Sequence, residues 1–255
     1  MTTIVTAYFE LEKSKQDHIT YLEWMKNMLI IQCPMVIFCD KNSVTKIEEI
    51  RNDDSLYPTK IITIDFTEFY TYKYMDIFEQ QYESKDHERF HSPYLYLIWN
   101  EKTHFLKRAI EINTFSTDHF LWVDIGCFRK PNYSFIHWPN SDKIPKDKML
   151  LLSVEPFTAE EYESDNLETL FDFQYSEGRI GGTIFGGTIN SILRWHKQYY
   201  QILEYFIYID RFIGKDQNIM NSIAILYKDT VELINTDPSV YDKWFYLQNY
   251  LVESS

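Results

Sequence analysis

A chain of 255 residues is long enough to bury its own hydrophobic core, and we expect one domain over residues 1–255. Hydrophobic residues make up 45% of the sequence and aromatic residues 17%, which excludes a disordered or low-complexity protein. Lys and Arg number 25 against 38 Asp and Glu, so the formal net charge is −13. We expect no binding to DNA or RNA, because nucleic acids are bound through cationic contacts to their phosphates.

The first half of the chain alternates short β-branched or apolar runs with helical patterns. The charged and aromatic stretch Phe66–Glu88 is expected to be helical with exposed turns. Ser43 and Thr103 stand where they could cap helices. The predicted strands are Thr3–Tyr8, Met35–Cys39, Lys60–Ile64 and His119–Val123, and the predicted helices are Asp17–Ile31, Val44–Ile50 and Thr103–Ile112.

The second half continues with strands predicted at Met149–Val154, Arg179–Phe185 and Val231–Ile234 and helices at Ser191–Phe206 and Lys215–Leu226. This alternation predicts an α/β fold with a mostly parallel central sheet flanked by helices. Such sheets bind ligands beyond the carboxyl ends of their strands. The segments to inspect are therefore Thr6–Phe9, Cys39–Asn42, Ile64–Phe66 and Asp124–Gly126.

Cysteine usage and the N-terminus bear on the compartment. Three scattered cysteines without a C-x-x-C pair indicate neither a disulfide framework nor a zinc ribbon. The N-terminus has no basic segment followed by an apolar one, and the longest apolar run, Tyr94–Trp99, is far too short to cross a membrane. We expect a reduced, cytoplasmic location and no transmembrane segment.

Asp124 carries the sharpest local signal. It directly ends the predicted buried strand His119–Val123, and a carboxylate at the edge of a sheet is costly to desolvate unless a partner uses it. Mg²⁺ or Mn²⁺ typically binds such a carboxylate, because hard cations prefer oxygen ligands and bridge to phosphates. The alternative is an aspartate that caps the next turn.

Glycine placement points to the same region. Of seven glycines none precedes Gly126, and five fall within residues 178–187. Gly126 and Gly214 each lie two positions from an aspartate, Asp124 and Asp216. The glycines either form bulges and turns or let a ligand approach the backbone. Asp216, which opens a predicted helix, is either a first-turn acid or a carboxylate directed at a sugar.

Two other patterns suggest different enzymes. Asp40 follows a strand, as the nucleophile of a haloacid-dehalogenase-type phosphatase does, but Asn42 stands where that chemistry needs a general acid. The run from His87 to His91 matches the H-E-x-x-H pattern of zinc proteases. Pro93 follows it closely and disfavours the helix that this pattern requires.

Four motifs in a fixed order carry a resemblance: Ile4–Phe9, Trp122–Arg129, Gly181–Gly187 and Lys215–Gln217. Together they resemble the HtrL/YibB-like family over nearly the whole chain. That family is similar to the GT-A glycosyltransferases and occurs in bacterial surface-polysaccharide loci and in some large DNA viruses. The resemblance implies a Rossmann-like GT-A fold, a nucleotide-sugar donor, a glycan or lipid-linked sugar acceptor and usually Mn²⁺ or Mg²⁺. A viral member would act in the host cytoplasm or with the virion.

The resemblance also implies roles for single residues in hexosyltransferase-like chemistry. Asp124 corresponds to the first acid of the Asp-x-Asp donor motif, a catalytic residue that contacts metal or ribose. Asp216 corresponds to a catalytic carboxylate that touches the donor sugar or acts as base. Gly126 stands where many transferases have a second metal-binding acid. Further donor contacts are expected from Thr6, Ala7, Tyr8, Asp40, Lys102, Arg129, Gly181, Gly182 and Lys215.

A second hypothesis comes from a different class of protein. Because Gly126 replaces the second acid, the chain could keep the fold as a non-catalytic nucleotide- or glycan-binding protein with a degenerate transferase site. The sequence leaves the two hypotheses open.

Overall fold

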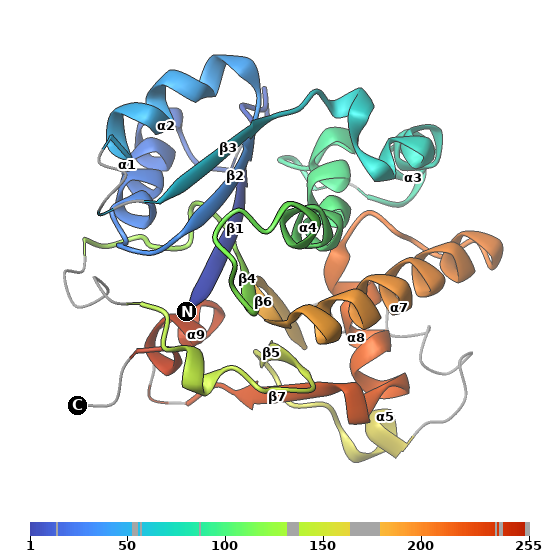
Figure 1. The fold of residues 1–255 in the computed structure, drawn as a ribbon. Helices are drawn as coiled ribbons and strands as arrows, with labels where there is room; N and C mark the ends of the chain where they lie inside the picture. Colours follow the sequence, from blue (N-terminus) through green and yellow to red (C-terminus); the bar gives the residue numbers. More distant parts are fainter. Residues whose placement is uncertain are drawn as a thin grey trace.

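Helices lie on both faces of a seven-stranded sheet in this computed structural model (Figure 1). The structure describes residues 1–13, 15–52, 56, 58–86, 88–131, 138–163, 179–237, 239 and 242–252. Strands from both halves of the chain join the one sheet. They are β1 (Thr2–Tyr8), β2 (Met35–Cys39), β3 (Thr59–Thr63), β4 (His119–Val123), β5 (Met149–Ser153), β6 (Ile180–Thr188) and β7 (Val231–Asn235).

The strand order is β3-β2-β1-β4-β6-β5-β7. β6 runs antiparallel to both of its neighbours, β4 and β5, and the other neighbouring pairs are parallel. The prediction of an α/β fold with a mostly parallel central sheet flanked by helices is confirmed. The parallel strands therefore end at one common edge, where β6 begins.

Two hydrophobic layers cover the sheet. Along β1, Val5 and Ala7 face one layer and Ile4 and Tyr8 the other, as alternation along a strand requires. The first layer comes mainly from α3 (Met75–Lys85), α4 (Pro93–Ile112), α7 (Ile189–Tyr208) and α8 (Asp216–Leu226). The second comes from α1 (His18–Leu29), α2 (Val44–Ile50) and α9 (Tyr246–Tyr250). A further short helix, α5, spans Ala159–Glu163.

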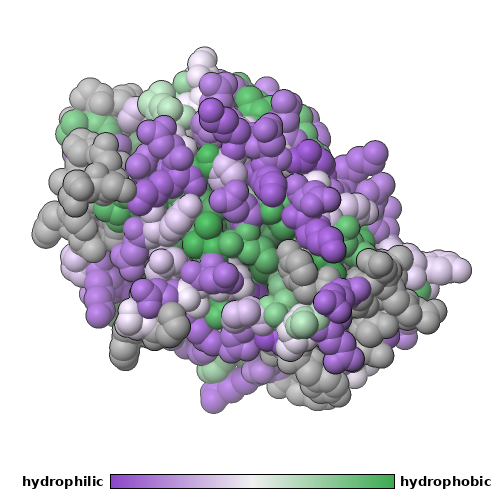
Figure 2. All heavy atoms as spheres, turned by 90° about the horizontal axis from the view of Figure 1, so that it is seen from below, coloured by the Kyte–Doolittle hydropathy of each residue, from purple (hydrophilic) through white to green (hydrophobic). Residues whose placement is uncertain are grey.

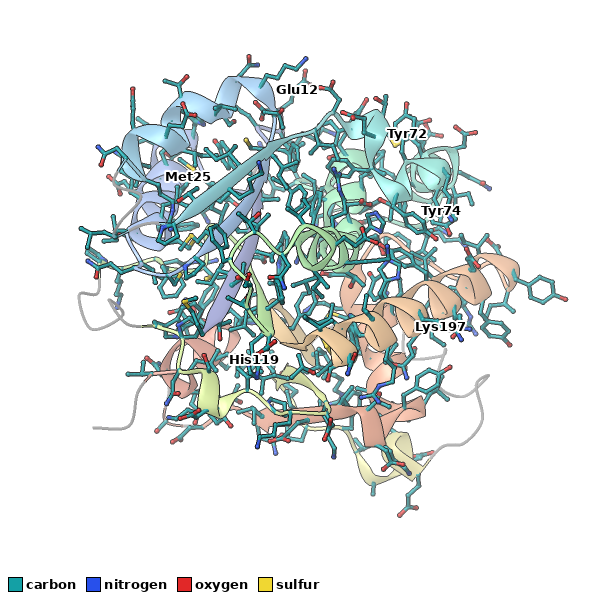
Figure 3. All side chains as sticks on the ribbon, in the orientation of Figure 1. Glu12, Met25, Tyr72, Tyr74, His119 and Lys197 are labelled. Atoms are coloured by element: carbon teal, nitrogen blue, oxygen red, sulfur yellow. The ribbon has the colours of Figure 1, made fainter. Side chains whose placement is uncertain are left out.

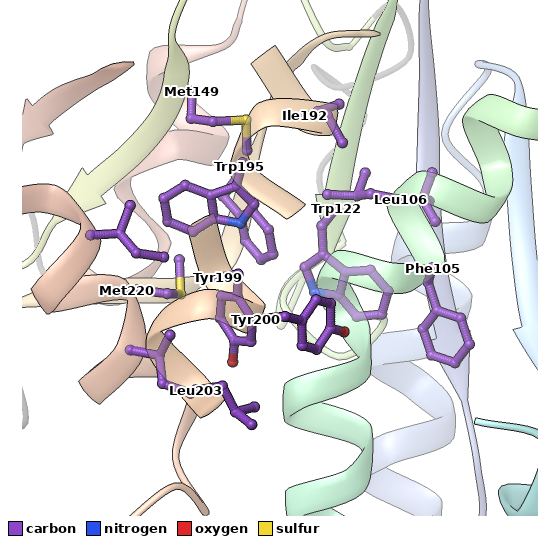
Figure 4. Close-up of a cluster of buried hydrophobic side chains, with 14 of the residues drawn as sticks. Phe105, Leu106, Trp122, Met149, Ile192, Trp195, Tyr199, Tyr200, Leu203 and Met220 are labelled. Carbon is purple, nitrogen blue, oxygen red and sulfur yellow. The ribbon is translucent and has the colours of Figure 1, made fainter. Parts of the chain in front are cut away.

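Aromatic residues fill the first layer. Figure 4 shows Trp122 of β4 beside Phe105 of α4, with ring centroids 6.1 Å apart and nearly parallel planes. Trp195 and Tyr199 of α7 lie in the same layer, with centroids 6.3 Å apart. This packing fixes the position of α4 against β4, and that position sets the geometry of the site described below.

The face seen in Figure 2 is mostly hydrophilic where its residues are coloured. Figure 3 shows Met25 between α1 and the strands, and Glu12 and Tyr72 at the periphery. Seen from below in Figure 2, hydrophilic side chains cover most of the face and hydrophobic residues gather in one central area. Among the described residues, no helix combines the length and apolar character needed to span a bilayer.

One predicted helix start is wrong, and one predicted side-chain cap does not form. α4 begins at Pro93, with Ser92 Oγ accepting a hydrogen bond from Leu95 N, because Pro at the first helical position reinforces a serine cap. Thr103 therefore lies in the middle of the helix, where Trp195 Nε1 donates to its Oγ1. Ser43 makes no side-chain cap for α2, because its hydroxyl bonds Asp40 instead. The other predicted elements of regular structure agree with the observed ones to within a few residues.

Candidate functional site

Four elements meet at the carboxyl edge of the sheet. Asp124 directly follows β4, and its backbone N–H donates to Thr183 O of β6 over 2.8 Å. Gly182 is the neighbouring residue of β6, and Asp216 is the first residue of α8. Lys102 reaches the same place from the middle of α4. We call Lys102, Asp124, Gly182 and Asp216 the Lys102 cluster.

Lys102 is the centre of this cluster. Its Nζ lies 3.2 Å from Asp124 Oδ1 and 3.0 Å from Asp216 Oδ2, and it donates to the carbonyl oxygen of Gly182 over 2.9 Å. The residue is 4% exposed. Three oxygen atoms, of Asp124 after β4, Gly182 in β6 and Asp216 in α8, thus lie within 3.2 Å of the ammonium nitrogen.

The electrostatics of the cluster keep the ammonium charged. Burial alone would lower the pKa of Lys102, but the carboxylates of Asp124 and Asp216 outweigh burial, and the pKa of Lys102 is raised. Burial raises the pKa of Asp216, while Lys102 acts in the opposite direction. The cluster therefore holds one cation between two carboxyl groups.

Asp124 is the accessible member. Its side chain is 31% exposed, against 8% for Asp216 and 5% for Lys102. Trp122, two positions earlier on the same face of β4, donates its Nε1–H to Asp124 Oδ1 over 2.7 Å. Trp122 and Lys102 together fix the orientation of a carboxylate that still faces solvent. The structure therefore brings Asp124 and Asp216 together, as the sequence predicted, and links them through Lys102.

A run of buried polar residues on α4 builds the cluster. Asn100, Glu101, Lys102 and Thr103 are consecutive and each is at most 4% exposed. Asn100 Nδ2 donates to Ile213 O over 3.0 Å, which ties α4 to the segment just before α8 and so to Asp216. Four consecutive buried polar residues cannot all lie on one face of a helix, and sequence reasoning missed this signal.

Glu101 points to a different part of the protein from Lys102. Its carboxylate accepts hydrogen bonds from Tyr70 N, Thr71 N and Thr71 Oγ1 at 2.7–3.0 Å. Burial raises the pKa of Glu101 to about 7, and these hydrogen bonds act in the opposite direction. Glu101 thereby anchors the segment at Tyr70 and Thr71 to α4.

Two glycines stand where a neighbouring side chain lies too close for a Cβ atom. A Cβ on Gly182 would lie 2.9 Å from Asp216 Oδ2, so a larger residue there would displace the carboxylate. A Cβ on Gly126 would lie 3.2 Å from the ring of Tyr21, which covers the position where a second acid was expected. Gly178, also within the glycine-rich stretch, lies outside the described residues.

Arg129 is an exposed cation held between two rings. Its guanidinium carbon lies 4.5 Å from the ring centroid of Trp24 and 4.5 Å from that of Phe245. Within the described ranges, no carboxylate forms an ion pair with Arg129. Tyr21, which covers Gly126, is also next to Trp24, with ring centroids 6.1 Å apart. Arg129 is thus a fixed positive charge on the segment that follows Asp124.

The other predicted donor contacts differ in accessibility. Thr6 is fully buried, and its Oγ1 has no hydrogen-bond partner among the described residues. Ala7 and Tyr8 are buried beside it, and burial raises the pKa of Tyr8 to about 12. Gly181 is buried against Leu152. Lys215 is half-buried at the cap of α8. Their contacts with a donor stay predictions.

Asp40 has a structural role that the phosphatase hypothesis did not include. Asp40 Oδ1 accepts hydrogen bonds from Asn42 N at 2.8 Å and Ser43 N at 3.0 Å, so the carboxylate caps the turn after β2. This engagement leaves the phosphatase hypothesis without support from the geometry.

The zinc-protease hypothesis concerned His87 and His91. His87 lies outside the described residues, while His91 lies between α3 and α4 rather than on a helix. His91 Nδ1 pairs with Asp86 Oδ2 at 2.6 Å. Residues 88–91 therefore do not form the helix that the zinc-protease pattern requires.

The arrangement does not fit a divalent cation. The place between Asp124 and Asp216 is held by the ammonium of Lys102. Within the described ranges, no three side chains of His, Cys, Asp or Glu come together as a metal site. The Mn²⁺ or Mg²⁺ expected at Asp124 stays a prediction from the resemblance.

Comparisons with known proteins add a family. The sequence model of a family described as "Bacterial protein of unknown function (HtrL_YibB)" matches residues 1–251. "Protein HtrL" of Escherichia coli (strain K12) is 24% identical over 271 residues, covering 96% of this chain and 90% of that protein. A crystal structure of mouse xyloside xylosyltransferase 1, apo form, is similar with a TM-score of 0.47 and 10% identity, covering 92% of this chain and 85% of that one.

Proposed function

This chain belongs to the HtrL_YibB family, and from that premise we propose that it is a glycosyltransferase. The proposed reaction moves a sugar from a nucleotide-diphosphate-sugar donor to a hydroxyl group of a glycan or a lipid-linked sugar. Two things support it: the order of four sequence motifs, and a carboxylate site at the carboxyl edge of a mostly parallel sheet, where such folds bind ligands.

The observation that carries the proposal is the geometry of Asp124. Its carboxylate is fixed by Trp122 and Lys102 and still has 31% of its side chain exposed. A fixed, accessible carboxylate suits the hydroxyl groups of a ribose or a sugar, which donate hydrogen bonds to it. We assign the sugar-contacting role to Asp124. Asp216, buried against Lys102, acts as a positioning residue for that contact.

The chemistry needs opposite charges at two places. In the transfer, the bond between the anomeric carbon and the diphosphate oxygen breaks, and its electron pair leaves with the diphosphate. The acceptor oxygen bonds to the anomeric carbon and gives up its proton to a base. Negative charge therefore develops on the diphosphate while the sugar becomes cationic. We assign Arg129 to the diphosphate and Asp124 to the sugar.

Titration of donors tests this function. UDP, GDP and their sugars are titrated calorimetrically into the protein, and release of nucleoside diphosphate from each sugar donor is followed over hours. The key variant is Asp124→Asn. Its matched control is Asp118→Asn, the same change at an exposed residue just before β4, at the opposite end of the same strand.

The wild type and Asp118→Asn should bind one donor and break it down slowly. Asp124→Asn should bind at least about tenfold more weakly, because a hydrogen bond to a charged group contributes about 1.5–3 kcal/mol. If Asp124→Asn binds the donor as tightly as the wild type and no donor is broken down, the alternative of a non-catalytic nucleotide- or glycan-binding protein is favoured. This alternative is supported by Tyr21, whose ring covers Gly126, the position where many transferases have a second acid.

A further inference from the structure

We propose that Lys102 takes the place of a divalent cation in this site, so that the Asp124 and Asp216 carboxylates work without a metal ion. The inference rests on the proposed function only for the identity of the ligand that Asp124 meets. Its structural part concerns the protein alone and can be tested with no donor present.

The oxygen set around Lys102 Nζ is the kind that a hard cation would use. It comprises two carboxylate oxygens, of Asp124 and Asp216, and the carbonyl oxygen of Gly182, at 2.9–3.2 Å. These are N–H···O distances, whereas Mg²⁺ requires oxygens at about 2.0–2.1 Å. One centre therefore holds either the ammonium or a metal ion, and the three oxygens are spaced for the ammonium.

Neighbouring residues keep the ammonium in that place. The Lys102 side chain comes from the middle of the 20-residue helix α4 and is 5% exposed. Its Nζ also lies 5.9 Å from the ring centroid of Trp122. If the ammonium left, the Asp124 carboxylate and the buried Asp216 carboxylate would face each other without a cation between them, which is unfavourable.

The position that would supply a further metal ligand is closed. Gly126 has no side chain, and a Cβ there would meet the Tyr21 ring at 3.2 Å and the Tyr21 hydroxyl oxygen at 3.3 Å. Tyr21 therefore occupies the space of the second acid. The glycine at 126 and the lysine at 102 fit one arrangement, in which the protein supplies the cation itself.

This arrangement divides the charge at the site. Lys102 offsets one of the two carboxylates, and Asp124 keeps an accessible edge for a sugar hydroxyl. The positive charge that the diphosphate needs comes from Arg129, held between Trp24 and Phe245. A donor can then bind through protein groups alone.

Mn²⁺ binding tests the inference. Protein dialysed against EDTA is titrated with Mn²⁺ alone and with Mn²⁺ plus UDP or GDP, and free Mn²⁺ is measured by electron paramagnetic resonance. The variants are Lys102→Ala, which empties the oxygen set, and Lys107→Ala, a matched control on the same helix whose lysine pairs with Glu111 at the surface. Thermal unfolding is recorded for each protein with and without Mn²⁺.

Wild type and Lys107→Ala should show no Mn²⁺ binding that depends on Asp124, and no change of Tm with Mn²⁺ or EDTA. Lys102→Ala should have a lower Tm and gain one bound Mn²⁺, which raises its Tm with concentration. A wild-type Mn²⁺ site that Asp124→Asn abolishes would overturn the inference even if Lys102→Ala does not fold. A folded Lys102→Ala that binds no Mn²⁺ would overturn it too. Neither outcome depends on transferase activity, so failure of the proposed function is seen separately.

Discussion

Replacing Lys102 by Met keeps most of the side-chain volume and removes the charge between Asp124 and Asp216. At an effective dielectric constant of about 20, two unit charges 3.0 Å apart attract by about 5 kcal/mol, and the second pair at 3.2 Å is similar. Burying the ammonium offsets much of this attraction. Breaking buried pairs by removing one partner costs about 3–5 kcal/mol, and we expect Lys102→Met to fall in that range.

Asp216→Asn should cost less, about 1–3 kcal/mol, because Lys102 keeps Asp124 and the Gly182 carbonyl as partners. In the double variant Lys102→Met/Asp216→Asn, the second change removes a like charge that faces Asp124. It should therefore restore part of the lost stability, which gives a coupling energy of about 1–3 kcal/mol.

Urea unfolding of the wild type, both single variants and the double variant measures these free energies. The m-value should stay constant, because the folded structure is the same in all four proteins. Strictly additive effects, or a loss below about 1 kcal/mol for Lys102→Met, would show that Lys102 does not hold the two carboxylates together.

Three further predictions concern neighbouring residues. Gly182→Ala should lower the free energy of unfolding by at least about 1 kcal/mol and weaken donor binding, because its Cβ would lie 2.9 Å from Asp216 Oδ2. A folded Gly182→Ala with unchanged donor binding would contradict the reasoning. The folded Glu101 carboxyl keeps its proton to about pH 7 against 4.5 when unfolded, so its stabilising contribution is present below pH 4.5 and lost as pH rises through 7. Across that range the wild type should lose about 3 kcal/mol relative to Glu101→Gln, and parallel pH profiles from chemical unfolding would refute the assignment. Arg129→Gln should weaken UDP or GDP binding about tenfold in calorimetry while changing stability by less than about 1 kcal/mol, and unchanged binding would remove Arg129 from the diphosphate.

Local patterns were enough to predict most strands of the fold. Met35–Cys39 is a continuous apolar run, His119–Val123 is apolar after its first residue, and both form strands with the predicted bounds. The antiparallel direction of β6 was not predicted, because strand direction follows from packing between segments far apart in the chain. The start of α4 was misplaced because Thr103 resembles a cap, although it is a buried polar residue in the middle of the helix.

Part of the site could likewise be predicted from the sequence, and part could not. Asp124 ends a strand and Asp216 begins a helix, so topology places both at one sheet edge. The central position of Lys102 depends on how α4 is rotated about its axis, which tertiary packing decides. The hydrogen bond from Trp122 to Asp124 could have been predicted from the sequence, because side chains two residues apart on a strand point the same way.

The most direct test of the central claim, that Asp124 receives the sugar of a nucleotide donor, is a crystal structure grown with a UDP- or GDP-sugar and Mn²⁺. We expect a ribose or donor-sugar hydroxyl within hydrogen-bond distance of Asp124, with Lys102 Nζ still between the two carboxylates. A donor bound away from the carboxyl end of β4, or a Mn²⁺ ion in the place of Lys102 Nζ, would contradict it.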